Sequence, residues 1–184
     1  MTMHLEAPAA LIVVDLQSAT LASPFASPAD DVVDVAAALV DAFHAHESVV
    51  VFAASTGTPR GQNAYGSEPR VFLPDHRVLA PALDVRESDV IVERAALSAF
   101  AGTDLAETLH DDGVTTVVVV GVATSFGVES TVRSAYDLGF HVVVASDAVT
   151  DLRAESNTHA LTAVFPAIAR VASSGDIVEA LGRD

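Results

Sequence analysis

The sequence predicts an α/β fold, a three-layer α/β/α sandwich of the Rossmann type around a six-stranded parallel sheet. Short, wholly apolar segments alternate along the chain with longer segments whose apolar residues recur at helical spacing. The short segments lack the polar alternation of a half-exposed strand, as is typical of strands covered on both faces. A length of 184 residues suits one domain. We therefore expect a single domain over residues 1–184.

Strands are expected where the chain is short, apolar and β-branched, over residues 9–14, 48–54, 90–92, 115–120, 141–145 and 168–171. Helices are expected over residues 30–46, 103–110, 155–165 and 174–181, and from Ser125 or Phe126 to Leu138. The polar, Gly- and Pro-rich segment 55–76 is predicted to be a long loop. His44 and His46 fall at the end of the first helix, where a cation meets the negative end of the helix dipole.

Composition excludes several function classes. The chain carries 25 acidic and nine basic residues, a formal charge of −16, which opposes binding to nucleic acid or to anionic membranes. All nine basic residues are Arg, so Schiff-base chemistry on lysine is excluded. The absence of Cys excludes disulfides, thiolate metal sites and cysteine nucleophiles. No apolar run reaches about 20 residues and the N-terminus lacks a basic signal region, so we expect a cytoplasmic protein.

Ligands of such folds bind at the carboxyl ends of the strands, so the residues that follow strands are the candidates for chemistry. Asp15 directly follows the first strand, where partial desolvation would raise the pKa of its carboxyl group and suit it to general acid or base catalysis. Capping of the next turn is an equally weighted role for this residue.

The segment Gly121–Val128 joins the most hydrophobic strand to a helix. Small residues at a helix N-terminus can direct backbone N–H groups at an anion or a developing oxyanion, although a tight turn needs small residues too. Arg94 ends the third strand. Its guanidinium could bind a substrate carboxylate in bidentate fashion, or pair with Glu93 or Asp15.

The order and spacing of these segments resemble the isochorismatase-like hydrolase superfamily, which includes nicotinamidases and cysteine amidases of the N-carbamoylsarcosine type. The resemblance covers nearly the whole chain. It implies the six-stranded parallel sheet, a cis peptide bond between Val122 and Ala123, and assembly into at least a dimer. Its landmarks are Leu11–Gln17, Ser98–Phe100 with Gly102–Leu105, Gly121–Thr124 with Val128–Thr131, Arg133–Ala135, Ser146–Ala148 and His159–Leu161.

The resemblance also exposes departures. Cysteine hydrolases of this family use an Asp, a Lys and a nucleophilic Cys. The Asp matches Asp15. Arg94 takes the position of the Lys, and Gly127 takes the position of the Cys. The thiol mechanism cannot operate, and Arg replaces Lys poorly as a proton carrier because its pKa exceeds about 12. The loop from Ser55 to Gln62 lacks the metal-binding Asp/His cluster of nicotinamidases, so neither zinc nor a cofactor is expected.

One branch of the family, the isochorismatases, carries Gly at the nucleophile position and cleaves a vinyl ether. There the Asp protonates the enol-ether carbon and water adds to the oxocarbenium ion. Asp15 and Gly127 fit this branch, but the turn Val122–Thr124 is nearer to the amidases. We therefore expect an amidase-like hydrolase that has lost its thiol, acting on a small vinyl-ether or amide-like substrate. Its catalytic residues would be Asp15, Arg94 and Gly127, and its substrate-binding residues Val122, Ala123, Thr124, Ser125 and Phe126.

Two other functions stay open. A relaxed G-x-S-x-G pattern around Ser125, followed by Asp147 and His159, has the order of an α/β-hydrolase triad. Alternatively, loss of both the thiol and the Lys would leave a non-catalytic binder of small molecules with the same fold.

Overall fold

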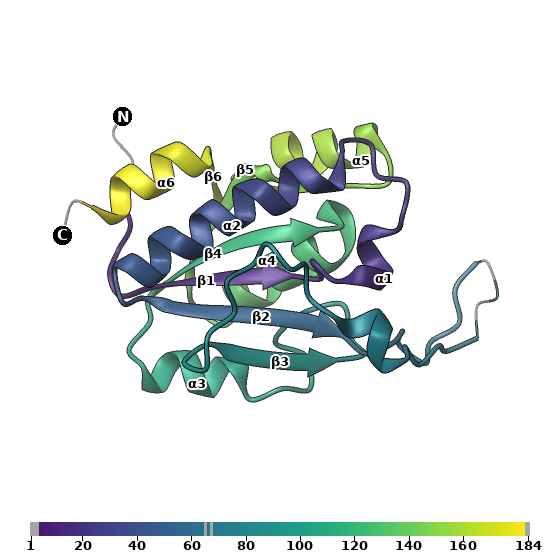
Figure 1. Ribbon diagram of the computed structural model, residues 1–184. Coiled ribbons are helices and arrows are strands. Elements are labelled where there is room, and N and C mark those ends of the chain that lie inside the picture. Colours follow the sequence, from purple (N-terminus) through teal and green to yellow (C-terminus); the bar gives the residue numbers. More distant parts are fainter. Residues whose placement is uncertain (1–3, 65, 67, 183–184) are drawn as a thin grey trace.

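The predicted fold class is confirmed by a computed structural model that describes residues 4–64, 66 and 68–182. Six strands form one sheet in the order β3-β2-β1-β4-β5-β6, and every neighbouring pair is parallel. The strands are β1 (Ala9–Val14), β2 (Val49–Ser55), β3 (Val90–Arg94), β4 (Thr116–Val122), β5 (His141–Thr150) and β6 (Arg170–Ala172). Figure 1 shows their arrows pointing the same way, so their carboxyl ends share one edge.

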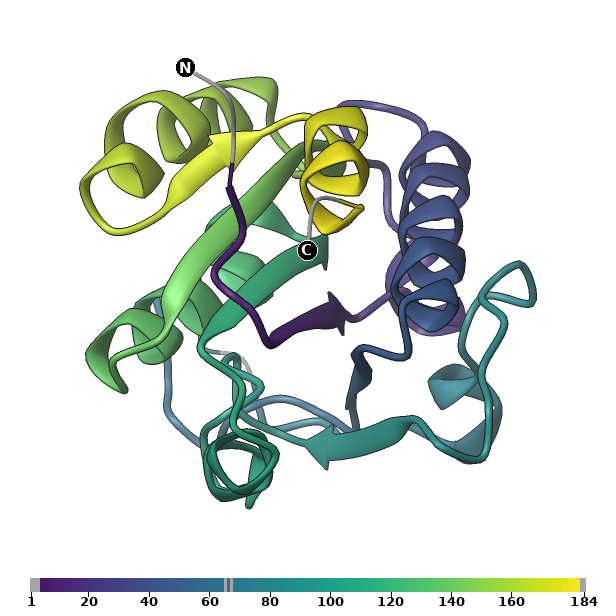
Figure 2. The same ribbon diagram turned by 90° about the vertical axis from the view of Figure 1, so that its left-hand side faces the viewer.

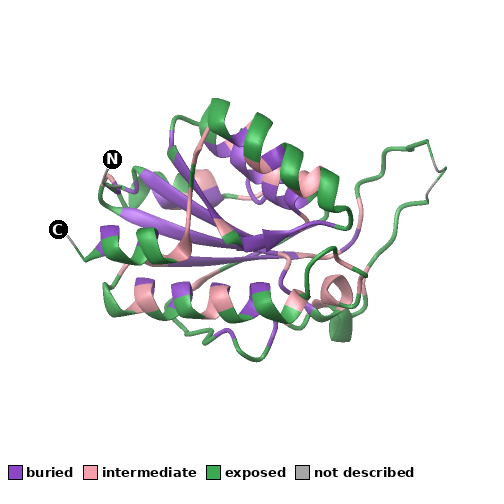
Figure 3. Ribbon diagram, turned by 90° about the horizontal axis from the view of Figure 1, so that it is seen from above, coloured by how far each residue is buried: buried purple, intermediate pink, exposed green. Residues whose placement is uncertain are grey.

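Helices cover both faces of this sheet (Figure 2). On one face α2 (Ala29–Ala45) and α6 (Ser174–Leu181) pack against the sheet, and on the other α3 (Leu105–Asp111) and α4 (Glu129–Asp137) do so. The shorter helices are α1 (Ser18–Leu21), α5 (Ala154–His159) and the 3-10 turns η1 (Pro74–Arg77) and η4 (Phe165–Ala167). Figure 3 shows the buried strands lying between helices whose outer sides are exposed.

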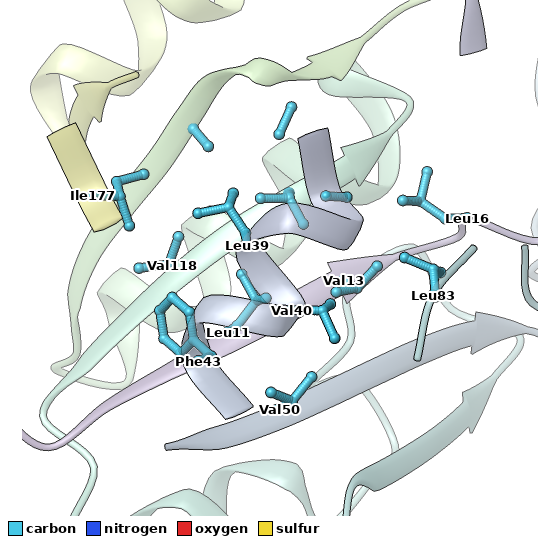
Figure 4. Packing of buried hydrophobic residues seen from close by; sticks show 14 of the residues in the cluster. Leu11, Val13, Leu16, Leu39, Val40, Phe43, Val50, Leu83, Val118 and Ile177 are labelled. Carbon is cyan, nitrogen blue, oxygen red and sulfur yellow. The ribbon is translucent and has the colours of Figure 1, made fainter. Parts of the chain in front are cut away.

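Two apolar clusters hold the layers together, one on each face of the sheet. Successive residues of β1 alternate between them: Leu11 and Val13 face α2, whereas Ile12 and Val14 face α3 and α4. Figure 4 shows Leu39, Val40 and Phe43 of α2 against Leu11, Val13 and Val118. All six residues of β1 are buried, which explains why this strand reads as an unbroken apolar run.

The two central strands approach closely at their carboxyl ends. Gly121 has φ +117°, and a Cβ at this position would overlap the carbonyl of Val14. Glycine therefore lets the end of β4 lie directly against the end of β1. The residues that follow these strands, Asp15 and the 123–128 turn, are brought together by this contact.

The helix predicted after β4 begins differently from the expectation. Its first turn is a π-helix, η2 (Thr124–Val128), in which the Val128 N–H donates to the Ala123 carbonyl at 3.3 Å, five residues back. The helix expected over 155–165 is likewise interrupted after His159 by a second π turn, η3 (Ala160–Val164). Strand β5 is longer than predicted because pairing with β4 resumes at Val149 after a register shift.

Candidate active site

Asp15 and Arg94 form a buried ion pair at the carboxyl edge of the sheet. The guanidinium donates in bidentate fashion, from Nη1 to Oδ1 at 2.6 Å and from Nη2 to Oδ2 at 3.0 Å. The Arg94 side chain is 1% exposed and that of Asp15 14%. Of the roles that the sequence left open for Arg94, the structure selects pairing with Asp15, so its fork is not free to hold a substrate carboxylate.

The positions of both residues follow from the sheet. Asp15 leaves β1 with φ +54° and its N–H still donates to Ala53 on β2 at 2.9 Å. Arg94 is the last residue of β3 and lies in register with Ser55 on β2. The pair thus spans from β1 to β3 over the end of the intervening strand. Nη2 of Arg94 also donates to the Leu97 carbonyl at 3.1 Å, which fixes the guanidinium from its far side.

Burial and the neighbouring guanidinium act in opposite directions on the pKa of Asp15. Burial raises the pKa of the Asp15 carboxyl group, and the Arg94 guanidinium offsets this rise only in part. Nε of Arg94 is buried without a hydrogen-bond partner among the described residues. A pKa raised above its ordinary value favours the protonated carboxyl group, which suits Asp15 to donating a proton.

Gly127 completes the immediate surroundings of this carboxylate. A Cβ at this position would lie 3.0 Å from Oδ2 of Asp15, 3.0 Å from Cγ1 of Val14 and 3.3 Å from the Val122 carbonyl. These distances are shorter than ordinary van der Waals contacts, so the lack of a side chain is what lets the turn lie directly against the Asp15 carboxylate. The Val122–Ala123 peptide bond that leads into this turn is cis, as the resemblance implies.

Other polar groups of the turn are bonded to the α5 region. The Thr124 hydroxyl, fully buried, donates to Oδ1 of Asn157 at 2.6 Å. The Ser125 N–H donates to Oδ2 of Asp151 at 2.6 Å, so this amide is not available to a bound anion. Val122 is buried at the end of β4, whereas the Phe126 side chain is 51% exposed. Two of the five predicted substrate-binding residues are therefore poorly placed to bind a substrate in this structure. The amide of Ser125 is already hydrogen-bonded, and the ring of Phe126 points toward solvent.

Two buried polar residues to which the sequence gives no evident role also support this edge. The fully buried Gln17 donates to the Ser55 carbonyl at 2.8 Å and accepts from the Ser55 N–H at 2.7 Å, which clamps the end of β2. Asp151 is 1% exposed and joins the turn to α5. Gln17 lies in the first landmark of the resemblance and Asp151 outside all of them. The one signal for Gln17 in the sequence is an amide side chain shortly after an apolar strand.

The serine triad is not assembled. The Asp147 carboxylate accepts from the Ser174 N–H at 2.8 Å and from its hydroxyl at 2.6 Å, at the start of α6. His159 is exposed at the end of α5, and within the described residues no hydrogen bond joins it to Asp147 or Ser125. The order of these residues in the sequence therefore does not correspond to a catalytic arrangement.

Within residues 4–64, 66 and 68–182, no three His, Asp or Glu side chains are grouped closely enough to hold a metal ion. The same part of the chain contains no helix that is long and apolar enough to cross a membrane.

Comparison with known proteins places these features in context. The sequence profile of the Isochorismatase domain matches residues 9–176. The chain is 36% identical over 181 residues to the isochorismatase family protein YecD of Escherichia coli O157:H7, covering 94% of this chain and 95% of that protein. An isochorismatase family structure from Burkholderia thailandensis has TM-score 0.93 and 35% identity, covering 97% and 98%. Pyrazinamidase of Pyrococcus horikoshii, solved in complex with zinc, has TM-score 0.76 and 27% identity, covering 90% and 98%.

Proposed function

The chain belongs to the isochorismatase family, and from this premise we propose that it hydrolyses a small-molecule vinyl ether or amide with Asp15 as general acid or base. The observation that carries the proposal is the placement of the Asp15 carboxylate. Both Nη atoms of Arg94 hold it rigidly at the carboxyl edge of the sheet, where its side chain keeps 14% of its surface exposed. A substrate atom bound at this exposed part lies within reach of proton transfer.

In the vinyl-ether reaction, protonated Asp15 gives its proton to the enol-ether carbon. Water adds to the resulting oxocarbenium ion, and the hemiacetal or hemiketal formed collapses to a carbonyl compound and an alcohol. The proton released from water restores Asp15. The raised pKa of Asp15 supports this acid role, because it keeps a larger fraction of the carboxyl group protonated.

In the amide reaction, ionised Asp15 takes a proton from water, which attacks the carbonyl carbon. Backbone N–H groups of Ala123 and Gly127 would stabilise the oxyanion, and the proton then passes to the leaving amine. The amidase-like turn Val122–Thr124 favours this route, as does the similarity to a pyrazinamidase. In both routes Arg94 positions Asp15 and holds no substrate.

The same proposal includes a cytoplasmic homo-oligomer with one domain over residues 1–184, no metal and no cofactor. The formal charge of −16 supports the absence of a nucleic-acid partner. Light scattering after size exclusion measures the oligomeric state.

The test is a panel of isochorismate, chorismate, small amides and ureides, assayed for turnover and for a shift in melting temperature. The proposal expects turnover of a panel member by the wild type and its loss in Asp15→Asn. Turnover unaffected by Asp15→Asn rules out the Asp15 mechanism. Binding without turnover in the wild type identifies the non-catalytic binder of the same fold.

A further inference from the structure

A cleft of about 500 Å³ opens at the carboxyl edge of the sheet, and Glu93 and Ala95, the chain neighbours of Arg94, contribute to its wall. Thr56 and Ala95 in its wall follow Ser55 and Arg94 directly in the chain. Apart from Glu93 of β3, the remainder comes from the loop after β2, which extends away from the sheet beyond the strand ends (Figure 1). In this loop the Thr58 N–H donates to the Arg70 carbonyl at 2.9 Å, so its two sides run as a short ribbon.

Three arginines line this cleft: Arg60, Arg70 and Arg77. They are a third of the nine basic residues of a chain whose formal charge is −16. The lining contains a single carboxylate, Glu93, so the charge of the described cleft is positive where the surface as a whole is negative. An anion bound in the cleft would be attracted by all three guanidinium groups.

The arginines are arranged to leave donors free. Arg77 is fixed in place, because its Nε donates to the Phe72 carbonyl at 2.9 Å while Nη1 lies 3.9 Å from Glu93. Arg60 and Arg70 form no side-chain hydrogen bond or ion pair within the described part of the chain. Their guanidinium groups therefore keep the full set of donors that recognises an oxyanion in bidentate fashion.

Arg94 cannot supply this recognition, because both its Nη atoms are engaged by Asp15 and by Leu97. We propose that the cleft lined by Arg60, Arg70 and Arg77 is a binding subsite for an oxyanion group, a carboxylate or a phosphate, of a small-molecule ligand. Building on the proposed function, the substrate of this hydrolase is then an anionic small molecule whose charged end lies in the cleft.

The binding test uses the whole chain with malonate or inorganic phosphate as probe, and neutral malonamide as control, in isothermal titration calorimetry. The wild type is expected to bind malonate, phosphate or both, and not malonamide. Which of the two binds more tightly identifies the carboxylate or the phosphate as the preferred group. In R60Q/R70Q the dissociation constant is expected to rise at least about tenfold. Absence of anion binding in the wild type overturns the proposal.

Matched variants separate the cleft from general charge and from folding. R86Q/R133Q removes the same charge at two exposed arginines outside the cleft and is expected to bind the anion like the wild type. E93Q removes the opposing carboxylate and is expected to tighten binding, an effect that unfolding cannot produce. Equal weakening in R86Q/R133Q and R60Q/R70Q overturns the proposal.

Anion binding needs no turnover, so its outcome is independent of the proposed catalysis. D15N is expected to retain the wild-type affinity for the anion. On any panel substrate that carries an oxyanion, R60Q/R70Q is expected to raise KM with kcat nearly unchanged, and to leave a neutral substrate unaffected. A KM that stays at the wild-type value for the anionic substrate overturns the assignment of the cleft to the substrate.

Discussion

Two buried pairs of polar side chains lie at opposite ends of β3, and only one of them belongs to the candidate active site. Asp15 and Arg94 meet at the carboxyl end, with Nη1 and Oδ1 2.6 Å apart. Near the amino end, Nε2 of His44 lies 2.8 Å from Oδ1 of Asp89, and these side chains are 4% and 3% exposed. Judged by the length of the contact alone, the two pairs are alike.

The pairs differ in what faces the carboxylate. The second oxygen of Asp89 accepts the Arg86 N–H at 2.7 Å, which closes that pair into a structural link between α2 and the start of β3. The Asp15 side chain keeps 14% of its surface exposed at the carboxyl edge of the sheet, against 3% for Asp89. Pairing holds both carboxylates in place, and access from solvent distinguishes the one suited to chemistry.

The largest expected effect is on turnover by Asp15→Asn. Loss of the proton donor or acceptor should lower kcat by about 10²–10⁴-fold on a substrate from the panel. Asp89→Asn is the matched variant at the other pair. It should leave kcat within about twofold and lower the free energy of unfolding by about 1–3 kcal/mol. Equal losses of kcat in both variants would remove the distinction between the two pairs.

Arg94→Ala tests the cost of breaking the first pair. It leaves a buried carboxylate unpaired and should lower the free energy of unfolding by about 3–5 kcal/mol, measured by urea titration. The double variant Asp15→Leu/Arg94→Met, which removes both charges, should recover most of that loss. Failure of the double variant to recover stability would show that packing, and not the charge, accounts for the effect.

Gly127→Ala crowds the Asp15 carboxylate and leaves the Asp89 carboxylate untouched. The added methyl would lie 3.0 Å from Asp15 Oδ2 and Val14 Cγ1. Such overpacking should cost about 1–3 kcal/mol of stability and lower turnover. Gly61→Ala is the control, because a Cβ there meets nothing within 4 Å. Full activity in Gly127→Ala would show that turnover does not depend on the position of the Asp15 carboxylate.

The smallest expected effect is a dependence on pH. Burial holds the pKa of Asp15 above its ordinary value of 3.8. A group of this kind stabilises the fold below its ordinary pKa, and this contribution is lost as pH rises through the raised value. The free energy of unfolding of the wild type relative to Asp15→Asn should fall over that interval. If Asp15 acts as an acid, kcat falls over the same interval, whereas a base gives a rise.

Much of the architecture could be predicted from the sequence because each strand is a local apolar run. The bounds of β1 were predicted to the residue, and parallel pairing of these runs follows from burial on both faces. The sequence could not show that β5 continues to Thr150, because the polar residues Ser146 and Asp147 interrupt the apolar run within the strand. Pairing across a register shift is a tertiary effect without a local signal.

The candidate site was predictable where a residue type meets a strand end. Asp15 and Arg94 were identified in this way, and their pairing was one of the options, although 79 positions separate them. His44 was assigned only the helix dipole, because Asp89 is far away in the chain and joins it only in the folded protein. Arg60 and Arg70 carried no signal in the sequence, since an exposed arginine in a polar loop is ordinary.

The place of Arg94 on β3 has a consequence for local opening of the fold. β3 is an edge strand that pairs only with β2, whereas Asp15 follows the central strand β1. Edge strands separate from a sheet at lower cost than central ones, so local unfolding of β3 removes the guanidinium while the carboxylate stays in place. Protonation of Asp15 weakens the link that holds β3 to the centre. Amide hydrogen exchange of Val92 therefore reports the charge state of a carboxyl group two strands away.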